Sequence, residues 1–450
     1  MKINFISLGC DKNLVDTEMM LGILSEHGHE LVNDVLDADV VVVNTCSFIS
    51  DAKIESINTL IEMGRLKEEG TIKGIIAAGC LAQRYTEDIR KDIPEVDEII
   101  GTMAIDEIAE AVDRIDKGNR ETFIKDIDGP LVYGKKRIVT TGGHFAYLKI
   151  AEGCDKHCTY CAIPSFRGKY RSVPMDVLVS EAKHLCENGV KELILVAQET
   201  SLYGTDLYGE KKLPELLRKL SEIEDLYFIR ILYCYPEEIT DEIIAEMASN
   251  KKVCHYIDMP IQHAGDRILK RMGRQTTNAD LRSIIEKLRK AIPDIAIRTT
   301  LITGFPGEKR SDVKEMEKFV KEMRFDRLGV FTYSREDGTA ASRMDGQVPQ
   351  FIKKIRRNRI MKLQQGIAFE KAEQEKGRTL LVMVEGRMPD ESLEGNQVYV
   401  CRTYKDAPDV DGFFFLETKN DLMTGDVVKA RVTGADKYDL VGVIDNEFTE

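Results

Sequence analysis

Short apolar runs alternate with helical patterns along most of this 450-residue chain, and no other feature constrains the fold as strongly. Strands separated by helices pair in parallel, and a parallel sheet is covered on both faces. We therefore predict a doubly wound α/β domain at residues 1–120. Its expected strands are residues 3–8, 40–45, 72–78 and 98–100, and its expected helices are residues 13–26, 51–67 and 81–91.

A second alternating series follows and predicts a central domain at residues 140–345. A complete (βα)8 barrel needs eight strands, so six strands predict a curved partial (βα)6 barrel with its site at the carboxyl ends of the strands. The expected strands are residues 145–150, 192–197, 227–232, 255–259, 295–302 and 328–331.

The last part of the chain has a different pattern. Residues 346–378 indicate a charged helical connector, and beyond them apolar residues recur with period two between Gly and Asp turns. This change predicts a small five-stranded β-barrel at residues 379–446. Its expected strands are residues 380–384, 397–401, 413–417, 427–432 and 440–444.

Composition indicates the cellular setting. The net charge of −13 argues against a uniformly basic nucleic-acid-binding surface, and no leader pattern or long apolar segment is visible. Ten cysteines in such a chain indicate thiolate ligands in a reducing compartment rather than disulfides. We expect a cytoplasmic protein with no membrane partner.

Three of the cysteines lie in one short loop, Cys154, Cys158 and Cys161, directly after the first strand of the central domain. Their C-x-x-x-C-x-x-C spacing lets three thiolates hold three irons of a 4Fe-4S cluster and leaves the fourth iron open. The alternative is a structural zinc site, which needs a fourth ligand from elsewhere, such as His157. The spacing favours the cluster.

Three more cysteines, Cys10, Cys46 and Cys80, each follow a predicted strand of the N-terminal sheet. The carboxyl ends of parallel strands share one edge, so these thiols should converge. A lone cysteine after a strand is most often a small buried apolar residue, but three equivalent positions make that interpretation less attractive. We expect the other four cysteines to be structural (Cys186, Cys234, Cys254 and Cys401).

The loop of Cys154 and the segment after it, AIPSFRGKYRS at residues 162–172, resemble the radical S-adenosylmethionine (SAM) methylthiotransferases. The resemblance covers nearly the whole chain and implies that the terminal barrel is a TRAM-like domain. It assigns Cys154, Cys158 and Cys161 to the cluster that binds SAM. It assigns Cys10, Cys46 and Cys80 to a second 4Fe-4S cluster that binds the transferred sulfur.

Polar residues near the strand ends are candidates for binding SAM. The resemblance places Tyr160 beside the adenine, although it could be an ordinary packed tyrosine. Gln198, Glu199, Gln262 and Arg298 could bond the ribose and amino acid parts of SAM. Arg298 could equally form a structural ion pair.

Two subfamilies compete for the substrate. Residues 7–18, SLGCDKNLVDTE, resemble the RimO type, which modifies an aspartate of the twelfth small-subunit ribosomal protein. The alternative subfamily modifies tRNA adenosines beside the anticodon. From residue 380 onward the chain has seven Lys and Arg against fifteen Asp and Glu, a net charge of −8. An acidic domain suits a basic protein better than tRNA phosphates, although it could be only a solvated face.

The resemblance implies that one SAM molecule methylates the cluster-bound sulfur and another is reductively cleaved to a 5′-deoxyadenosyl radical. That radical takes hydrogen from the aspartate β-carbon, so we nominate no catalytic acid–base pair. The implied partners are the ribosomal protein or the small ribosomal subunit, and a low-potential electron donor such as flavodoxin or ferredoxin. The rival class is a non-enzymatic metal-containing ribosome or RNA adaptor, which the open coordination sites argue against.

Overall fold

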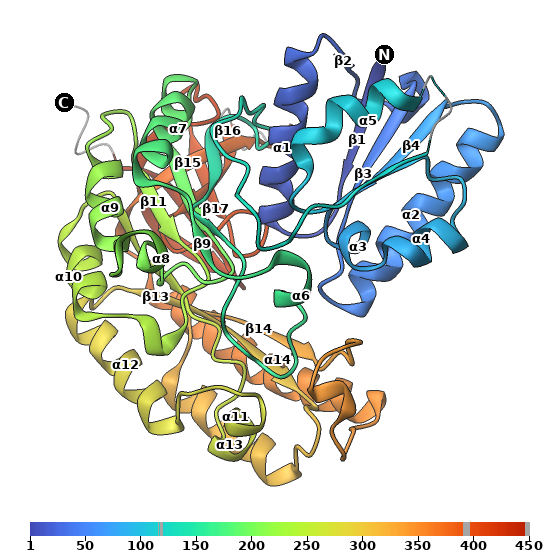
Figure 1. Ribbon diagram of the computed structural model, residues 1–450. Helices are drawn as coiled ribbons and strands as arrows, with labels where there is room; N and C mark the ends of the chain where they lie inside the picture. Colours follow the sequence, from blue (N-terminus) through green and yellow to red (C-terminus); the bar gives the residue numbers. More distant parts are fainter. Residues whose placement is uncertain (116, 118–119, 390–396, 446–450) are drawn as a thin grey trace.

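The computed structural model describes residues 1–115, 117, 120–389 and 397–445, and these form three sheet-based domains (Figure 1). Residue 446, the expected end of the terminal barrel, lies outside the described residues. In the described part of the chain, no helix is long and apolar enough to cross a membrane.

The N-terminal domain is built on a six-stranded parallel sheet of order β2-β1-β3-β4-β5-β6. β3 and β4 are buried along their whole lengths, as strands covered on both faces must be. The four predicted strands are confirmed, whereas β2 and β6 are two-residue edge strands too short to show a pattern. The strands are β1 (Lys2–Ser7), β2 (Glu30–Leu31), β3 (Val40–Thr45), β4 (Gly74–Ala78), β5 (Glu98–Ile100) and β6 (Thr122–Phe123).

Helices pack on both faces of this sheet in two separate apolar clusters. The predicted helix at residues 81–91 is wrong in one respect, because it is two helices that break at Tyr85. The Thr86 hydroxyl donates to the Ala82 carbonyl at 2.6 Å, a bond that competes with the helical backbone pattern. The helices are α1 (Asp11–Glu26), α2 (Ser50–Glu68), α3 (Gly79–Arg84), α4 (Thr86–Asp92) and α5 (Ile108–Ile115), with 3-10 turns at Val35–Asp37 and Ile105–Glu107.

The central domain contains a second six-stranded parallel sheet, of order β14-β13-β12-β11-β10-β7. Its end strands β14 and β7 do not pair with each other, so the barrel is partial, as predicted. A short antiparallel pair, β8 and β9, stands at the base of the cysteine loop. The strands are β7 (Phe145–Lys149), β8 (Ala151–Glu152), β9 (Arg171–Ser172), β10 (Glu192–Val196), β11 (Phe228–Ile231), β12 (Val253–Asp258), β13 (Ala296–Thr303) and β14 (Arg327–Thr332).

Amphipathic helices cover the outer face of this sheet and bury the largest apolar cluster of the molecule. The last of them, α14, packs against β13 and β14 and leads to the terminal barrel (Figure 1). The helices from the cysteine loop to the terminal barrel are α6 (Pro164–Arg167), α7 (Met175–Glu187), α8 (Thr205–Tyr208), α9 (Leu213–Ser221), α10 (Asp241–Ser249), α11 (Asp266–Arg271), α12 (Asn278–Ala291), α13 (Arg310–Met323) and α14 (Gln350–Gln374), with 3-10 turns at Pro236–Glu238 and Ala341–Arg343.

The C-terminal domain is the predicted barrel, closed in the order β15-β16-β17-β19-β18. Its inner residues alternate along the strands and form a small core that includes Val382, Cys401 and Phe414. The strands are β15 (Thr379–Arg387), β16 (Gln397–Thr403), β17 (Phe414–Thr418), β18 (Val427–Asp436) and β19 (Asp439–Ile444).

The barrel is docked on the central domain through buried charges. Glu192, at the start of β10, lies between the guanidinium groups of Arg230 and Arg402, each 2.7 Å from a different carboxylate oxygen. All three side chains are buried. The carbonyl of Tyr404, in the segment between β16 and β17, also accepts from Arg230 at 2.6 Å. This barrel segment therefore packs against the inner face of the central sheet.

Candidate functional site

The three cysteines of the N-terminal domain converge at one edge of its sheet, as predicted. Cys10 is the N-cap of α1, Cys46 follows β3, and Cys80 is the second residue of α3. β1, β3 and β4 are neighbours in the sheet, which brings the three positions together. The approach is close, because a Cβ atom added to Gly9 would lie 2.8 Å from the Cys46 sulfur. The side chain of Cys10 is exposed, whereas Cys46 and Cys80 are buried.

Asn13 ties the loops of this triad to one another. Its amide nitrogen donates to the carbonyl of Leu8 at 3.1 Å and to the carbonyl of Thr45 at 3.0 Å. Its amide oxygen accepts from the Cys80 thiol at 3.4 Å. Sequence reasoning missed this role, although Asn13 lies within the RimO-like segment. A single buried amide thus fixes the loops that follow β1, β3 and β4.

Burial raises the pKa of Cys80 to about 12, and the pKa of Cys46 is raised for the same reason. The Arg167 guanidinium opposes the shift at both thiols, while the neighbouring cysteines reinforce it at Cys80. Thiols in this environment stay protonated unless a positively charged partner replaces the lost solvation. The irons of a cluster are such a partner.

The second triad lies in the loop between β8 and α6. The Cys154 amide donates to the Gly168 carbonyl and the Cys161 amide to the Cys158 carbonyl, both at 3.0 Å. Gly153 has φ +79°, and a Cβ there would lie 1.9 Å from a backbone oxygen, so the loop needs glycine at this position. Burial raises the pKa of both Cys154 and Cys161 to about 12.

The arrangement of these thiols bears on the zinc alternative. Among the described residues, no three His, Cys, Asp or Glu side chains come together closely enough to hold one metal ion. A zinc ion needs four ligands at about 2.0–2.3 Å from a single atom. In a 4Fe-4S cluster each thiolate binds its own iron, so the sulfurs are further apart. Among the described residues, neither triad has the ligand spacing of a closed zinc site.

The predicted SAM-binding residues divide into two groups. Tyr160, in the loop, packs edge-to-face on Phe305 with ring centroids 6.5 Å apart. Gln198 donates to Glu152 at 2.6 Å, and burial raises the pKa of Glu199 to about 7. The Tyr235 amide donates to Glu199 at 3.4 Å, and the Tyr235 hydroxyl lies 3.5 Å from the Cys158 sulfur, which places this carboxyl near the second triad.

Gln262 and Arg298 have different surroundings. Gln262 adopts φ +68° and bridges to Leu301 of β13 through its backbone. Arg298 is the third residue of β13, and its Nη1 lies 3.1 Å from the Asp258 carboxylate. Its Nε lies 3.6 Å from the carboxylate of Asp411 in the barrel domain. For Arg298 the geometry supports the structural ion pair, the alternative that the sequence left open.

A residue that sequence reasoning missed, Arg274, lies beside the second triad. Its side chain is buried, its guanidinium is 4.1 Å from the centre of the Tyr235 ring, and its Nη2 donates to a backbone carbonyl. Its Nε and Nη1 have no hydrogen-bond partner among the described residues. Interactions with Tyr160 and Cys158 raise its pKa, although burial opposes the shift. A buried cation with free donors is suited to an incoming carboxylate.

An arginine from each domain reaches across the domain interface. Arg167 of the central domain donates to the Cys80 sulfur, and Arg84 of α3 lowers the otherwise raised pKa of Cys161. The same interface contains an ion pair of 2.7 Å between Lys53 of α2 and the buried Glu336. Figure 1 shows α3 and α6 facing each other between the two domains. The two cysteine triads therefore border one interdomain region.

Three family models match successive parts of the chain. They are described as uncharacterized protein family UPF0004 at residues 2–101, Radical SAM superfamily at residues 148–320 and TRAM domain at residues 377–444. The ribosomal protein uS12 methylthiotransferase RimO of Lachnoclostridium phytofermentans is 57% identical over 442 residues, covering 98% of this chain and 99% of that protein. This chain belongs to the RimO family. The prediction of a RimO-type radical SAM methylthiotransferase is confirmed.

A second RimO, from Acetivibrio thermocellus, is 48% identical over 456 residues and covers 100% of this chain and 99% of that protein. Both relatives carry the uS12 name, which favours the ribosomal-protein prediction over the tRNA alternative. Among solved structures, the radical SAM methyltransferase TsrM from Kitasatospora setae has a TM-score of 0.55 at 13% identity. That match covers 88% of this chain and 80% of TsrM, and it shows a shared fold.

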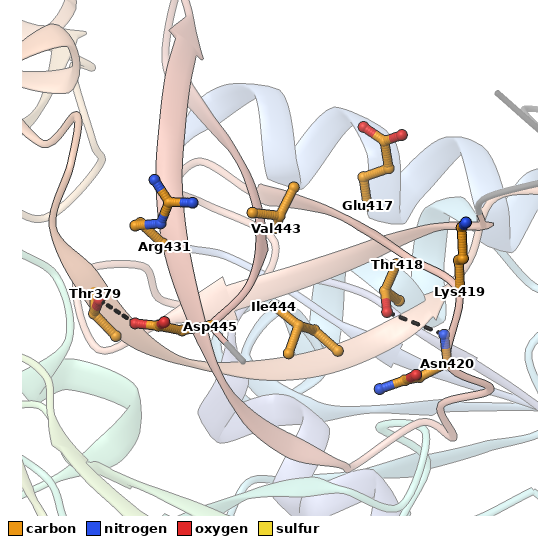
Figure 2. A pocket seen from close by; sticks show the side chains of 9 residues that line it. All are labelled: Thr379, Glu417, Thr418, Lys419, Asn420, Arg431, Val443, Ile444 and Asp445. Carbon is orange, nitrogen blue, oxygen red and sulfur yellow. Dashed lines mark hydrogen bonds between the residues drawn. The ribbon is translucent and has the colours of Figure 1, made fainter. Parts of the chain in front are cut away.

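The RimO-family barrel also has a surface pocket, shown in Figure 2. It lies between strand ends of the barrel, where the Thr379 hydroxyl donates to Asp445 at 2.6 Å. Its lining combines two acidic and two basic side chains and includes no cysteine, so we assign it no part in the chemistry. The lining residues are Thr379, Glu417, Thr418, Lys419, Asn420, Arg431, Val443, Ile444 and Asp445.

Proposed function

We propose that this RimO-family chain adds a methylthio group to the β-carbon of an aspartate in ribosomal protein uS12, using SAM and two 4Fe-4S clusters. One cluster would bind Cys10, Cys46 and Cys80, and the other Cys154, Cys158 and Cys161. The observation that supports this proposal most strongly is that two cysteine triads border the same interdomain region. A single-cluster enzyme would not need the first triad.

Each triad offers three thiolates for four irons and so leaves one iron for an exogenous ligand. When bound, the clusters supply the electron that cleaves SAM and a holding place for the sulfur being transferred. The chain's own part is to fix the thiols in space. Asn13 does so for the first triad, and the backbone bonds of Cys154 and Cys161 do so for the second.

Two buried side chains near the second triad have polar atoms without partners and fit the amino acid part of SAM. Arg274 has two free donors, and the Oε2 atom of Glu199 has no partner among the described residues. SAM carries a carboxylate and an ammonium group, the complements of these two side chains. We propose that Arg274 and Glu199 orient SAM, with Tyr160, Gln198 and Gln262 completing the pocket. Arg298 is left out, because Asp258 and Asp411 already pair with it.

The internal pairing of basic side chains on α14 supports a protein substrate over tRNA. Lys353 is buried and donates to the Tyr333 carbonyl at 2.6 Å. Arg356 pairs with Glu308 at 2.7 Å, and Arg359 pairs with Glu317. Three of the five cations at residues 353–359 are therefore not free to neutralise RNA phosphates, whereas Lys354 is exposed and Arg357 bonds the neighbouring Asn358. The barrel, with its net charge of −8 from residue 380 onward, would instead attract a basic ribosomal protein.

We further propose that the domains follow the predicted division. Residues 1–120 would carry the second cluster, residues 140–345 the SAM cluster, residues 346–378 the connector and residues 379–446 the docking barrel. The electron would come from a low-potential donor such as flavodoxin or ferredoxin. We place the reaction in the cytoplasm, where uS12 enters the small ribosomal subunit.

The test is an anaerobic reaction of the reconstituted protein with SAM, sulfide, a reductant, unmodified small ribosomal subunits and bulk tRNA. Mass spectrometry of both products should show a methylthio group on one aspartate of uS12 and none on tRNA. A methylthio-adenosine would instead establish the tRNA alternative. A protein that holds two clusters but leaves SAM uncleaved would support the rival hypothesis of a non-enzymatic ribosome or RNA adaptor.

A further inference from the structure

The side chain of Arg167 makes a direct contact between the two cluster-binding regions. Arg167 ends α6, six residues after Cys161, and its side chain is only 2% exposed. Its Nε and Nη2 atoms lie 3.3 and 3.2 Å from the Cys80 sulfur. A residue of the SAM loop thus donates two hydrogen bonds to a thiol assigned to the other cluster.

The guanidinium is held in this position by fixed acceptors. Nη2 also donates to the Asn13 amide oxygen at 2.5 Å. Nη1 lies 2.8 Å from the Asp16 carboxylate and 2.9 Å from that of Glu152. The acceptors come from both domains, since Asp16 and Asn13 belong to α1 and Glu152 to β8. Arg167 therefore cannot turn away from Cys80 without breaking several buried bonds.

Charge pairing alone does not account for this arrangement. The two carboxylates already have a second cation, because Lys149 bonds to both Asp16 and Glu152. The contact that distinguishes Arg167 from Lys149 is its pair of bonds to the Cys80 sulfur. A cluster thiolate accepts such bonds strongly, because a charged donor then meets a charged acceptor.

We propose that Arg167 is a positioning residue that raises the reduction potential of the cluster held by Cys10, Cys46 and Cys80. Reduction adds negative charge to a cluster, and a fixed neighbouring cation stabilises that charge. Hydrogen bonds to the ligand sulfurs are known to set cluster potentials, and they act in the same direction. The inference rests on the proposed function, since it requires the N-terminal cluster.

The test uses the full-length chain with Cys154→Ala, Cys158→Ala and Cys161→Ala, so that only the N-terminal cluster assembles. After anaerobic reconstitution, the cluster is titrated with dithionite as the one-electron reductant and followed by electron paramagnetic resonance. The readout is the midpoint potential, which does not depend on turnover. The variants to compare are Arg167→Gln, Arg167→Lys, Asp16→Asn and the control Lys169→Gln.

We expect Arg167→Gln to shift the midpoint to lower potential and Arg167→Lys to shift it less, because lysine keeps the charge but not the paired donors. Asp16→Asn should shift it the other way, because it removes a countercharge from Arg167. Lys169→Gln should change little, since the side chain of Lys169 is 77% exposed and pairs with Asp128. A lower midpoint in the first two variants together with the opposite shift in Asp16→Asn would support the proposal.

A cluster that keeps the wild-type midpoint in Arg167→Gln would overturn the role of Arg167. A shift of equal size in Lys169→Gln would do the same, because it would show a general charge effect. If Arg167→Gln fails to hold iron, the opposite shifts of Arg167→Lys and Asp16→Asn still decide the question. A parent protein that binds no cluster at Cys10, Cys46 and Cys80 would overturn the proposed function itself, and the inference with it.

Discussion

Glu192→Gln should loosen the terminal barrel from the central domain. The carboxylate of Glu192 is fully buried and lies 2.7 Å from both Arg230 and Arg402. Breaking a buried ion pair costs about 3–5 kcal/mol, since a charge is left uncompensated. We expect a cost at the lower end of this range. Arg402 keeps its ion pair with Glu385, and Arg230 keeps its hydrogen bonds to two backbone carbonyls. A loss of about 3 kcal/mol raises the population of the undocked barrel roughly 100-fold.

Hydrogen exchange measured by mass spectrometry would report this opening for each peptide. The largest increase in exchange is expected in peptides that contain β16. The matched control is Glu370→Gln, which breaks an ion pair between the exposed residues Glu370 and Arg324 and should cost under about 1 kcal/mol. Burial opposes ionisation of Glu192, but Arg230 and Arg402 lower its pKa overall. The stabilisation of barrel docking by the Glu192 carboxylate should therefore be lost as the pH falls. Glu192→Gln should not show this loss. Equal exchange in the two variants would refute the reasoning.

Three further predictions concern the site and the N-terminal sheet. Arg274→Gln should weaken SAM binding at least about 10-fold, measured by equilibrium dialysis, with unchanged iron content, since one charged hydrogen bond is worth about 1.5–3 kcal/mol. Alanine at Cys10, Cys46 or Cys80 should remove about half of the iron, measured by elemental analysis, whereas Cys401→Ala, in the barrel core, should remove none. Burial raises the pKa of Glu98 to about 7, so wild-type stability should fall as pH rises from about 4.5 through 7. Glu98→Gln should lack this fall and be about 1 kcal/mol more stable at pH 8 in urea unfolding, whereas parallel curves for the two proteins would contradict the assignment.

The strands and the cysteine triads could be predicted from the sequence because both depend on local signals. β3 begins with four consecutive valines because both of its faces are buried, and a thiol directly after the strand must lie at the carboxyl edge of the sheet. The two-residue strands β2 and β6 carry no such signal. The break at Tyr85 was also hidden, because the side-chain bond that accompanies it depends on a rotamer and not on composition.

The partners of charged side chains could not be predicted, because ion pairs join residues that are far apart in the sequence and become neighbours only in the fold. Arg298 and Arg274 both lie in the central domain close to segments expected to bind SAM, and only the fold shows which one is already paired. Arg298 is paired partly by Asp411, more than a hundred residues away in the terminal barrel. Arg274, just after α11, looks like an ordinary surface residue at a helix end until its burial is known. The sequence could therefore name the kind of site but not all of its polar residues.

The two triads are also coupled in a way that neither motif indicates. Arg167 belongs to the central domain and donates to the Cys80 sulfur, while Arg84 belongs to the N-terminal domain and donates to the Asp337 carbonyl of the central domain. Moving the domains apart would break both arginine contacts at once, and it would break the Lys53–Glu336 pair. The electrostatic surroundings of each proposed cluster thus depend on the same interface. Domain packing and cluster chemistry should therefore change together in any variant that disturbs this interface.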